Sequence, residues 1–118
     1  MSGKWGIIGA GLIGGKRAAA LATLGEKIAA VADVDAKRAE YLAMQYSAAH
    51  ASDWKKITRG QSIDAVVVAT THDVLSEISV DALQHGKHVL VEKPAGRNPA
   101  EVRAIIDAKQ KSGKQACV

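Results

Sequence analysis

The sequence predicts an α/β fold in which helices cover both faces of a parallel sheet, a doubly wound arrangement. Stretches typical of strands and helices alternate along all 118 residues. The strand-like stretches are apolar on both faces, as they are when helices cover a sheet on both sides. A glycine-rich turn joins the first strand to the first helix. Right-handed crossovers then favour the strand order 3-2-1-4-5-6.

Short apolar runs and helix-ending residues define the elements of the first half. The stretch after the glycine turn is rich in alanine and leucine, which favour a helix, and Gly25 is placed to cap it. Asp35 is a suitable N-cap for the next helix. In order, we expect a strand at 5–8, a helix at 12–24, a strand at 27–32, a helix at 36–46, a weak strand at 48–51 and a short helix at 53–58.

The second half begins with AVVVAT, a continuous β-branched run typical of a buried strand. Asn98 is placed to cap the last helix, with Pro99 at its first position, Glu101 where a capping-box acid belongs and Gly113 at its end. In order, we expect a strand at 65–70, a helix at 75–85, a strand at 88–92, a helix at 99–111 and a strand beginning at 115–118.

Length and composition are those of one ordinary globular domain. The chain is 47% hydrophobic and 24% charged, which excludes a disordered protein. The net charge is +4, but the cations are scattered as pairs and only 3% of residues are aromatic. A nucleic-acid-binding face needs clustered cations, and proteins that bind single strands usually add stacking aromatic rings, so we expect no nucleic-acid partner. The excess positive charge would instead attract an anionic cofactor.

The single cysteine, Cys117, allows no internal disulfide and fits a reducing compartment. No apolar run approaches the ~20 residues of a membrane helix. Residues 6–15 are apolar but contain glycines and lack a cleavage site before Lys16, which argues against a signal peptide. We therefore expect a soluble, cytoplasmic protein with no membrane partner.

The glycine-rich turn has the spacing Gly9-x-Gly11-x-x-Gly14. In dinucleotide-binding turns the first glycine allows the tight turn, the second lets a pyrophosphate approach the backbone, and the third lets helix and strand pack closely. The amides of Leu12 and Ile13, at the helix start, would then face the phosphates. A close-packed turn without a ligand is the alternative.

Asp33, at the end of the second strand, strengthens this interpretation. An acid at that position accepts hydrogen bonds from the adenosine ribose hydroxyls, so the turn and the acid together predict a dinucleotide site. A carboxylate repels a 2′-phosphate, which favours NAD over NADP. Lys37 and Arg38 follow closely. They could admit the phosphate of NADP, although we expect both to face the solvent.

Further along, the chain contains the stretches VADVD, DAVVVAT and HGKHVLVEKPAG. Together with the glycine turn they resemble the N-terminal half of the glucose–fructose oxidoreductase, inositol dehydrogenase and rhizopine-catabolism (Gfo/Idh/MocA) family of NAD(P)-dependent oxidoreductases. The resemblance covers essentially the whole chain and implies one Rossmann domain over residues 1–118. Family members add a C-terminal α/β domain that carries most of the sugar-binding surface, and we expect this chain to lack it.

The resemblance implies roles for residues after the fourth and fifth strands. Lys93 matches the lysine near the nicotinamide that helps bind substrate or transfer the proton, and Glu92 matches the acid that contacts the nicotinamide ribose. Pro94 matches a proline whose preceding peptide bond is often cis. Thr70 matches the residue that borders the cofactor after the fourth strand. Thr71 departs from the pattern, because the family commonly has proline there.

A catalytic role for Lys93 also has a chemical basis. Oxidising an alcohol sends a proton to a base, and an ordinary lysine, with a pKa of about 10.4, is a poor base at neutral pH. A dry pocket beside a cationic nicotinamide would lower that pKa. The alternative is a surface lysine in a loop. His72 follows the fourth strand and either contacts the ribose or ring or is an ordinary loop histidine. No cysteine or acid cluster accompanies His85 and His88, so we expect no metal site.

The sequence therefore predicts the NAD(P)-binding domain of an oxidoreductase that acts on a hydroxyl of a sugar, nucleotide sugar or cyclitol. The sugar-like substrate would bind mainly to the further domain, and we expect a homo-oligomer. Two alternatives stay open. One is a regulatory nucleotide-binding module without catalysis, and the other is a reductase domain for imine or biliverdin-type substrates.

Overall fold

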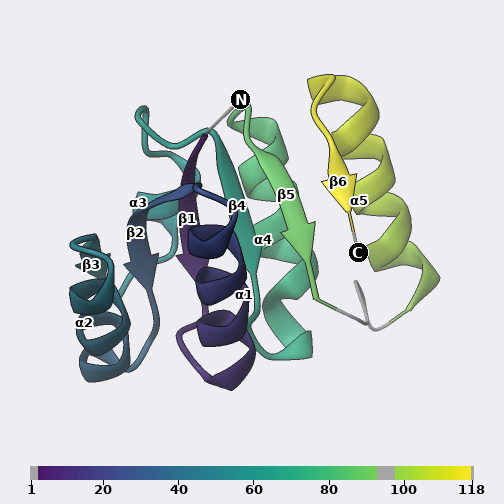
Figure 1. Cartoon of the computed structure of the whole chain (residues 1–118). Coiled ribbons are helices and arrows are strands. Elements are labelled where there is room, and N and C mark those ends of the chain that lie inside the picture. The colour runs from purple at the N-terminus through teal and green to yellow at the C-terminus, as the bar shows by residue number, and fades with distance from the viewer. Residues whose placement is uncertain (1–2, 93–97, 118) are drawn as a thin grey trace.

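The computed structural model describes residues 3–92 and 98–117, and within them strands and helices alternate as predicted (Figure 1). The elements are β1 (Lys4–Ile8), α1 (Leu12–Thr23), β2 (Lys27–Ala32), α2 (Ala36–Gln45), β3 (Ala49–Ala51), α3 (Lys55–Thr58), β4 (Ala65–Val68), α4 (His72–Gln84), β5 (His88–Val91), α5 (Pro99–Ser112) and β6 (Ala116–Cys117).

The strands form one six-stranded sheet in the order β3-β2-β1-β4-β5-β6. Each neighbouring pair is parallel. Both the parallel pairing and the predicted order 3-2-1-4-5-6 are confirmed. The order runs outward from β1 to β3 on one side and from β4 to β6 on the other, so the chain changes direction between β1 and β4 at the centre of the sheet.

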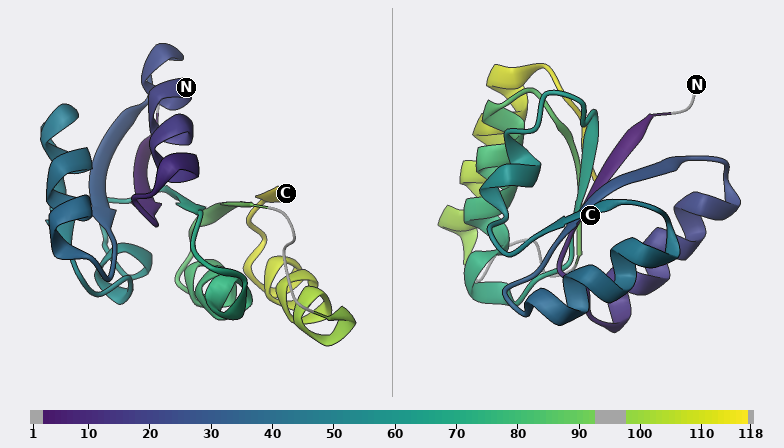
Figure 2. Two further views of the ribbon diagram at one scale, coloured as in Figure 1. Left: turned by 90° about the horizontal axis from the view of Figure 1, so that it is seen from below. Right: turned by 90° about the vertical axis from the view of Figure 1, so that its left-hand side faces the viewer.

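Helices cover both faces of the sheet, with α1 and α2 on one face and α3, α4 and α5 on the other (Figure 2). Successive strand residues therefore point into different halves of the core. In β1, Ile7 packs with α1 and α2, whereas Ile8 packs with α4. In β4, Val67 joins the first cluster, and Val66 and Val68 join the second. This alternation explains why these strands are apolar on both faces.

The predicted helix ends are confirmed where a side chain or a glycine defines them. Asp35 caps α2 by accepting hydrogen bonds from two first-turn amides, and Asn98 accepts one from the amide of Glu101 at 3.0 Å. Gly113 ends α5 with φ 71°, in the left-handed region that glycine favours. Gly25 has the same kind of backbone, with φ +83°.

Several predicted boundaries were wrong by a few residues. The helix expected at 75–85 begins at His72, the strand expected to reach residue 70 ends at Val68, and the short helix begins at Lys55. The helix was predicted to begin at Leu75, which is its first buried apolar residue. The first turn of a helix needs no apolar residue, because its amides have no partners within the helix and suit polar neighbours. No described helix is long and apolar enough to cross a membrane.

Candidate functional site

A cleft lies at the carboxyl ends of β1 and β4, where the strand order changes direction. Open α/β sheets bind ligands at such a point. The cleft has a volume of about 830 Å³, within the usual range for small-molecule sites. It brings together part of the site predicted from the sequence, namely Gly9, Gly11, Asp33, Thr70 and Thr71.

The three glycines of the turn have different surroundings. Gly9 has φ +100°, and a Cβ there would lie 2.4 Å from the carbonyl oxygen of Ala69, so only glycine fits. A Cβ on Gly14 would lie 1.8 Å from the carbonyl oxygen of Gly9, so this glycine allows α1 to approach the turn. A Cβ on Gly11 would meet nothing within 4 Å. The space beside Gly11 is therefore open to a ligand.

Helix α1 begins directly after Gly11, with Leu12 and Ile13 as its first residues. The first-turn amides of a helix have no partners within the helix, and they carry the positive end of the helix dipole. The exposed side chains of Leu12 and Ile13 are apolar and offer no hydrogen bond to a phosphate. Any contact of these two residues with phosphate would therefore be made by the backbone. This geometry suits a pyrophosphate group.

Asp33 is held beside the glycine turn by two backbone hydrogen bonds. Its Oδ2 accepts from the amide of Ala10 at 2.7 Å, and its Oδ1 accepts from the amide of Asp35 at 2.8 Å. Each carboxylate oxygen has a further lone pair available. The carboxylate is thus fixed in position and can still accept hydrogen bonds from the vicinal hydroxyls of a ribose.

Of the two cations that follow Asp33, only Arg38 lies at the cleft. Arg38 lines the cleft, and its Nε lies 3.8 Å from the Oδ2 of Asp35. Lys37 is exposed and is not among the cleft residues. Both were expected to face the solvent and both are exposed, although Arg38 also borders the cleft beside Asp33.

The sequence analysis did not predict that an apolar wall lines the cleft. Trp54 packs against the core cluster and also lines the cleft. Val34, next to Asp33, lines the same cleft with 91% of its surface exposed. An exposed valine and a tryptophan that line the same cleft as Asp33 would suit a flat heteroaromatic base. The exposure of Val34 depends on the turn after β2, which the sequence pattern did not define.

Glu92 directly follows β5 and is paired with Arg17 of α1. Arg17 Nε lies 2.6 Å from Glu92 Oε2, and Arg17 Nη2 lies 3.0 Å from Glu92 Oε1. This hydrogen bond and the charge of Glu92 raise the pKa of Arg17 above its ordinary value. Arg17 was not predicted as a site residue. One signal was present, because Arg17 lies one helical turn after Gly14 and so shares the face that approaches the sheet.

The structure describes only some of the other residues that were predicted to belong to the site. Thr70 lies in the loop after β4, and its Oγ1 lies 3.4 Å from the carbonyl oxygen of Thr71. His72 begins α4, but its side chain lies outside the described part of the structure. Lys93 and Pro94 also lie outside the described residues. The predicted catalytic role of Lys93 therefore stays a prediction.

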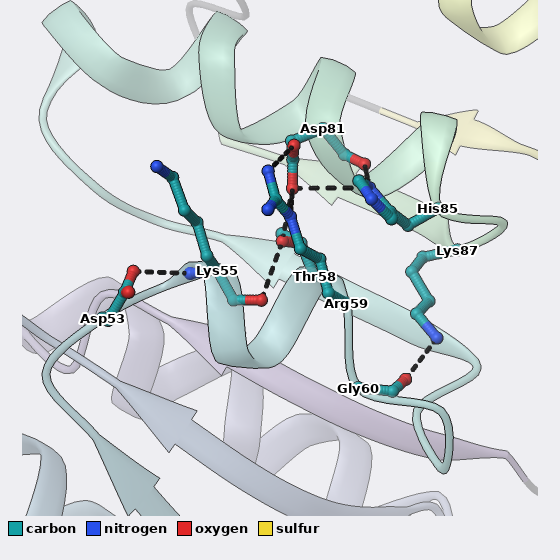
Figure 3. Close-up of polar contacts among 8 residues, drawn as sticks. All are labelled: Asp53, Lys55, Thr58, Arg59, Gly60, Asp81, His85 and Lys87. Carbon is teal, nitrogen blue, oxygen red and sulfur yellow. Dashed lines mark hydrogen bonds and ion pairs between the residues drawn. The ribbon is translucent and has the colours of Figure 1, made fainter.

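A second polar cluster connects α3 to the carboxyl end of α4, at the far end of that helix from the cleft (Figure 3). Asp81 accepts hydrogen bonds from Thr58 Oγ1 at 2.6 Å and from Arg59 Nη2 at 2.9 Å. Burial alone would raise the pKa of Asp81, but the hydrogen bonds from Arg59 and Thr58 and the charge of His85 outweigh it and hold that pKa below its ordinary value. The cluster fixes α3 against α4.

Lys87 is buried close to this cluster, and its Nζ donates a hydrogen bond to the carbonyl oxygen of Gly60 (Figure 3). Burial lowers the pKa of Lys87. The exposed ring of His88 accepts a hydrogen bond from the amide of Gln115 at 3.0 Å. Across residues 3–92 and 98–117, no group of three or more His, Cys, Asp or Glu side chains could hold a metal ion.

The doubly wound parallel sheet, the glycine turn and the fixed acid after β2 define a dinucleotide-binding Rossmann domain. The chain belongs to the Gfo/Idh/MocA family, described as an oxidoreductase family with an NAD-binding Rossmann fold, whose model matches residues 3–118. The resemblance seen in the sequence is thereby confirmed, as is the assignment to an NAD-binding family.

The chain is similar to several dehydrogenases of this kind. It is 30% identical over 119 residues to inositol 2-dehydrogenase of Salmonella paratyphi B, covering 98% of the chain and 35% of that enzyme. It is 34% identical over 115 residues to trans-1,2-dihydrobenzene-1,2-diol dehydrogenase of Xenopus laevis, covering 94% of the chain and 35% of that enzyme.

Among solved structures, an NAD-binding oxidoreductase from Klebsiella pneumoniae has a TM-score of 0.87 and 26% sequence identity. The alignment covers 99% of this chain and 34% of that protein. The chain therefore spans about a third of the length of the relatives that it matches.

Proposed function

We propose that this chain is the cofactor-binding part of an oxidoreductase that uses NAD and acts on a hydroxyl group of a cyclitol or sugar-like alcohol. The observation that carries the cofactor choice is the carboxylate of Asp33, which hydrogen bonds fix beside the open edge of the glycine turn. The choice of substrate class is supported by the inositol and dihydrodiol dehydrogenases to which the chain is similar.

The residues present fit a dinucleotide along the carboxyl edge of the sheet. The open space at Gly11 and the first-turn amides of Leu12 and Ile13 would hold the pyrophosphate. Asp33 would accept hydrogen bonds from the adenosine ribose. Thr70, Thr71 and His72 follow β4 and would border the nicotinamide half, where Glu92, Lys93 and Pro94 follow β5. When bound, the cofactor supplies the chemistry of hydride exchange.

Lys93 would act as the acid–base group for the substrate hydroxyl. In the sequence it directly follows Glu92, and Glu92 lies after β5 at the carboxyl edge of the sheet, where ligands of open α/β sheets bind. In an alcohol oxidation the lysine would take the hydroxyl proton, so it must be neutral at the start of that step. Exclusion of water and a nearby positive charge both favour neutral lysine.

We propose that the substrate site includes surfaces outside these 118 residues. The chain corresponds to about a third of its relatives' length, so we propose that a further α/β domain positions the substrate against the cofactor.

We also propose a cytoplasmic homo-oligomer. The single cysteine is consistent with a reducing compartment. Sedimentation velocity over a range of concentrations measures the association, and a monomer at every concentration would contradict the proposed oligomer.

Titration calorimetry of the folded chain with NADH and NADPH tests the proposed cofactor. We expect NADH to bind these 118 residues more tightly than NADPH. The binding should be weak, because the proposed further domain would be needed to cover the cofactor. Gly11→Ala should abolish or strongly reduce binding without unfolding the chain, because the new methyl group would occupy only the open space at the turn.

Gly15→Ala is the matched control. Its Cβ would also meet nothing within 4 Å, but Gly15 lies further into α1 and does not line the cleft. Absence of binding by the parent chain with either nucleotide would refute the cofactor assignment. A clear preference for NADPH would refute the role given to Asp33. Equal effects of the two alanine substitutions would refute a pyrophosphate contact at Gly11.

A further inference from the structure

The Arg17–Glu92 ion pair joins two parts of the fold that are 75 residues apart in the sequence. Arg17 belongs to α1, which connects β1 to β2, whereas Glu92 follows β5 on the other side of β4. The pair therefore spans the carboxyl end of β4, where the strand order changes direction. It links the helix whose first turn would hold the pyrophosphate to the edge where the nicotinamide half would lie.

The geometry of the pair leaves Glu92 able to bind a further group. Arg17 contacts one carboxylate oxygen through Nε and the other through Nη2, so each oxygen gives one lone pair to the guanidinium. A carboxylate has about four lone-pair sites in all. The two remaining sites can accept hydrogen bonds from a pair of neighbouring hydroxyl groups. The two contacts with arginine also limit the rotation of the carboxylate.

Both partners are anchored through their own elements. The amide of Glu92 donates a hydrogen bond to the carbonyl oxygen of Val68 at 3.1 Å, which ties its backbone to the end of β4. Helix α1 is locked to the turn by the close approach of Gly14 to Gly9. The Glu92 side chain is only 19% exposed and that of Arg17 is 43% exposed, so solvent screens this pair less than a surface pair.

We propose that Arg17 is a positioning residue, which aims the Glu92 carboxylate at the hydroxyl groups of the ribose next to the nicotinamide. Arg17 acts through Glu92 and does not itself contact the ligand. The inference rests on the proposed function, because it assumes that the cleft takes a dinucleotide. Beyond the proposed function, it makes the contact between Glu92 and the ribose depend on Arg17 of α1, the helix whose first turn would hold the pyrophosphate.

Calorimetric titration of the folded chain with three nucleotides distinguishes this positioning role from a general effect on the fold. NADH and ADP-ribose both carry the second ribose, whereas ADP lacks it. Arg17→Met keeps a stem of similar size and removes the guanidinium. We expect it to weaken NADH and ADP-ribose binding about tenfold, the factor given by one hydrogen bond of about 1.4 kcal/mol, and to leave ADP binding within about twofold.

The double variant tests whether Arg17 acts through Glu92. Glu92→Gln alone should show the same selective loss as Arg17→Met. Adding Arg17→Met to Glu92→Gln should cause little further loss, because the pair is already broken. Additive losses would show that Arg17 contacts the ligand directly and would overturn the proposal. Lys16→Met, which removes the exposed neighbouring cation of α1, controls for loss of positive charge.

The remaining outcomes are also decisive. Equal weakening of all three nucleotides by Arg17→Met, or none, would assign the pair to the stability of the fold alone, and thermal unfolding of each variant measures that contribution separately. If the parent chain bound neither NADH nor ADP, the proposed function would fail together with this inference. If the parent bound both and Arg17→Met had no selective effect, only this inference would fail.

Discussion

Gly9, Gly11 and Gly14 differ in what surrounds the position where a side chain would begin. Two of them are required by the fold, because a Cβ on Gly9 or Gly14 would overlap backbone atoms. Gly11 is not required by packing, since its Cβ would meet nothing within 4 Å. A glycine that the fold does not need, at the start of a helix beside a cleft, is best explained by a ligand that approaches the backbone.

The packing role of Gly14 predicts a loss of stability on substitution. In Gly14→Ala the new methyl group would lie 1.8 Å from the carbonyl oxygen of Gly9, so α1 or the turn must move. We expect the free energy of unfolding to fall by about 1–3 kcal/mol or more, as overpacking in a core does. Urea denaturation followed by circular dichroism measures it.

Gly15→Ala serves as the comparison for Gly14→Ala. Its side chain would enter open space, and replacing glycine by alanine inside a helix stabilises it by roughly 0.5–1 kcal/mol. The two neighbouring substitutions should therefore change stability in opposite directions. Similar effects at both positions would contradict the close contact between α1 and the turn.

Arg38 is the residue through which the chain would tolerate NADP. It lines the cleft with Asp33, whereas Lys37 does not. We expect Arg38→Ala to weaken NADPH binding about tenfold, the lower end for a hydrogen bond to a charged group, and to change NADH binding little. Lys37→Ala removes the same charge from an exposed position and should affect neither nucleotide selectively. Calorimetric titration compares the four values, and equal losses for the two variants would rule out a specific phosphate contact.

At the level of single residues, spacing was enough to predict the tight turn at Gly9, the close packing at Gly14 and the position of Asp33. Each depends on a local rule, either the geometry of a tight turn or the residue that ends a strand. The Arg17–Glu92 pair and the wall formed by Val34 and Trp54 could not be predicted in this way. Their partners come together only through the order of the strands and the direction of the loops.

At the level of elements, the helix ends with a chemical signal were predictable and the others were not. Asp35, Asn98 and Gly113 end their helices through their own hydrogen bonds or backbone geometry. The start of α4 lies three residues before Leu75, at which the sequence pattern placed it, and the predicted start was therefore too late. The connection between α3 and α4 through Asp81 was also not visible in the sequence, since it joins residues of two separate helices.

The Asp81 cluster predicts an acid-dependent stability. The folded state holds the pKa of Asp81 below its ordinary value of 3.8. Its ionised form therefore stabilises the fold at neutral pH, and this contribution is lost as the pH falls below about 3.8 and through the lower pKa of the folded state. Asp81→Asn should lower the free energy of unfolding at pH 7 by about 1–2 kcal/mol, because it weakens hydrogen bonds to a charged group.

The pH profile distinguishes this role from a general loss of packing. The difference in stability between the parent and Asp81→Asn should shrink as the pH falls from about 5 to 2, because the parent carboxylate becomes protonated. Urea denaturation at several pH values measures the difference. Asp107→Asn, at an exposed carboxylate of α5, is the control. A difference that stays constant across this range would contradict an ionised Asp81 in the folded state.

At the level of the whole molecule, the alternation of elements determined the architecture. Strands that are apolar on both faces must be covered on both sides, and right-handed crossovers then leave few possible strand orders. The structure has the predicted order, and its cleft lies where that order changes direction. In the proposed function, a further domain supplies the surface that holds a substrate alcohol against the nicotinamide end, because the relatives that the chain matches are about three times as long.

If a further domain holds the substrate, the 118-residue chain should bind nucleotide without turning over any sugar or cyclitol. Holding the reacting groups in the correct geometry can supply about 7–11 kcal/mol of the barrier, and here the further domain would do so. In a protein that joins this chain to that domain, Lys93→Ala should lower kcat by about 10²–10⁴-fold, the usual contribution of a general acid–base group. Binding of NADH should change far less, since the pyrophosphate and adenosine contacts would be unaffected.

Lys93→Arg separates proton transfer from positive charge in the same protein. A guanidinium keeps the charge of lysine but cannot act as a base, so this variant should restore little activity. Steady-state kinetics with a saturating cyclitol substrate, together with NADH titration of each variant, provides the measurement. If Lys93→Ala left kcat within about threefold of the parent, well short of the acid–base range, the proton would have to go to another group. If Lys93→Arg restored kcat fully, the lysine would act through its charge alone, and its role would be to bind the substrate.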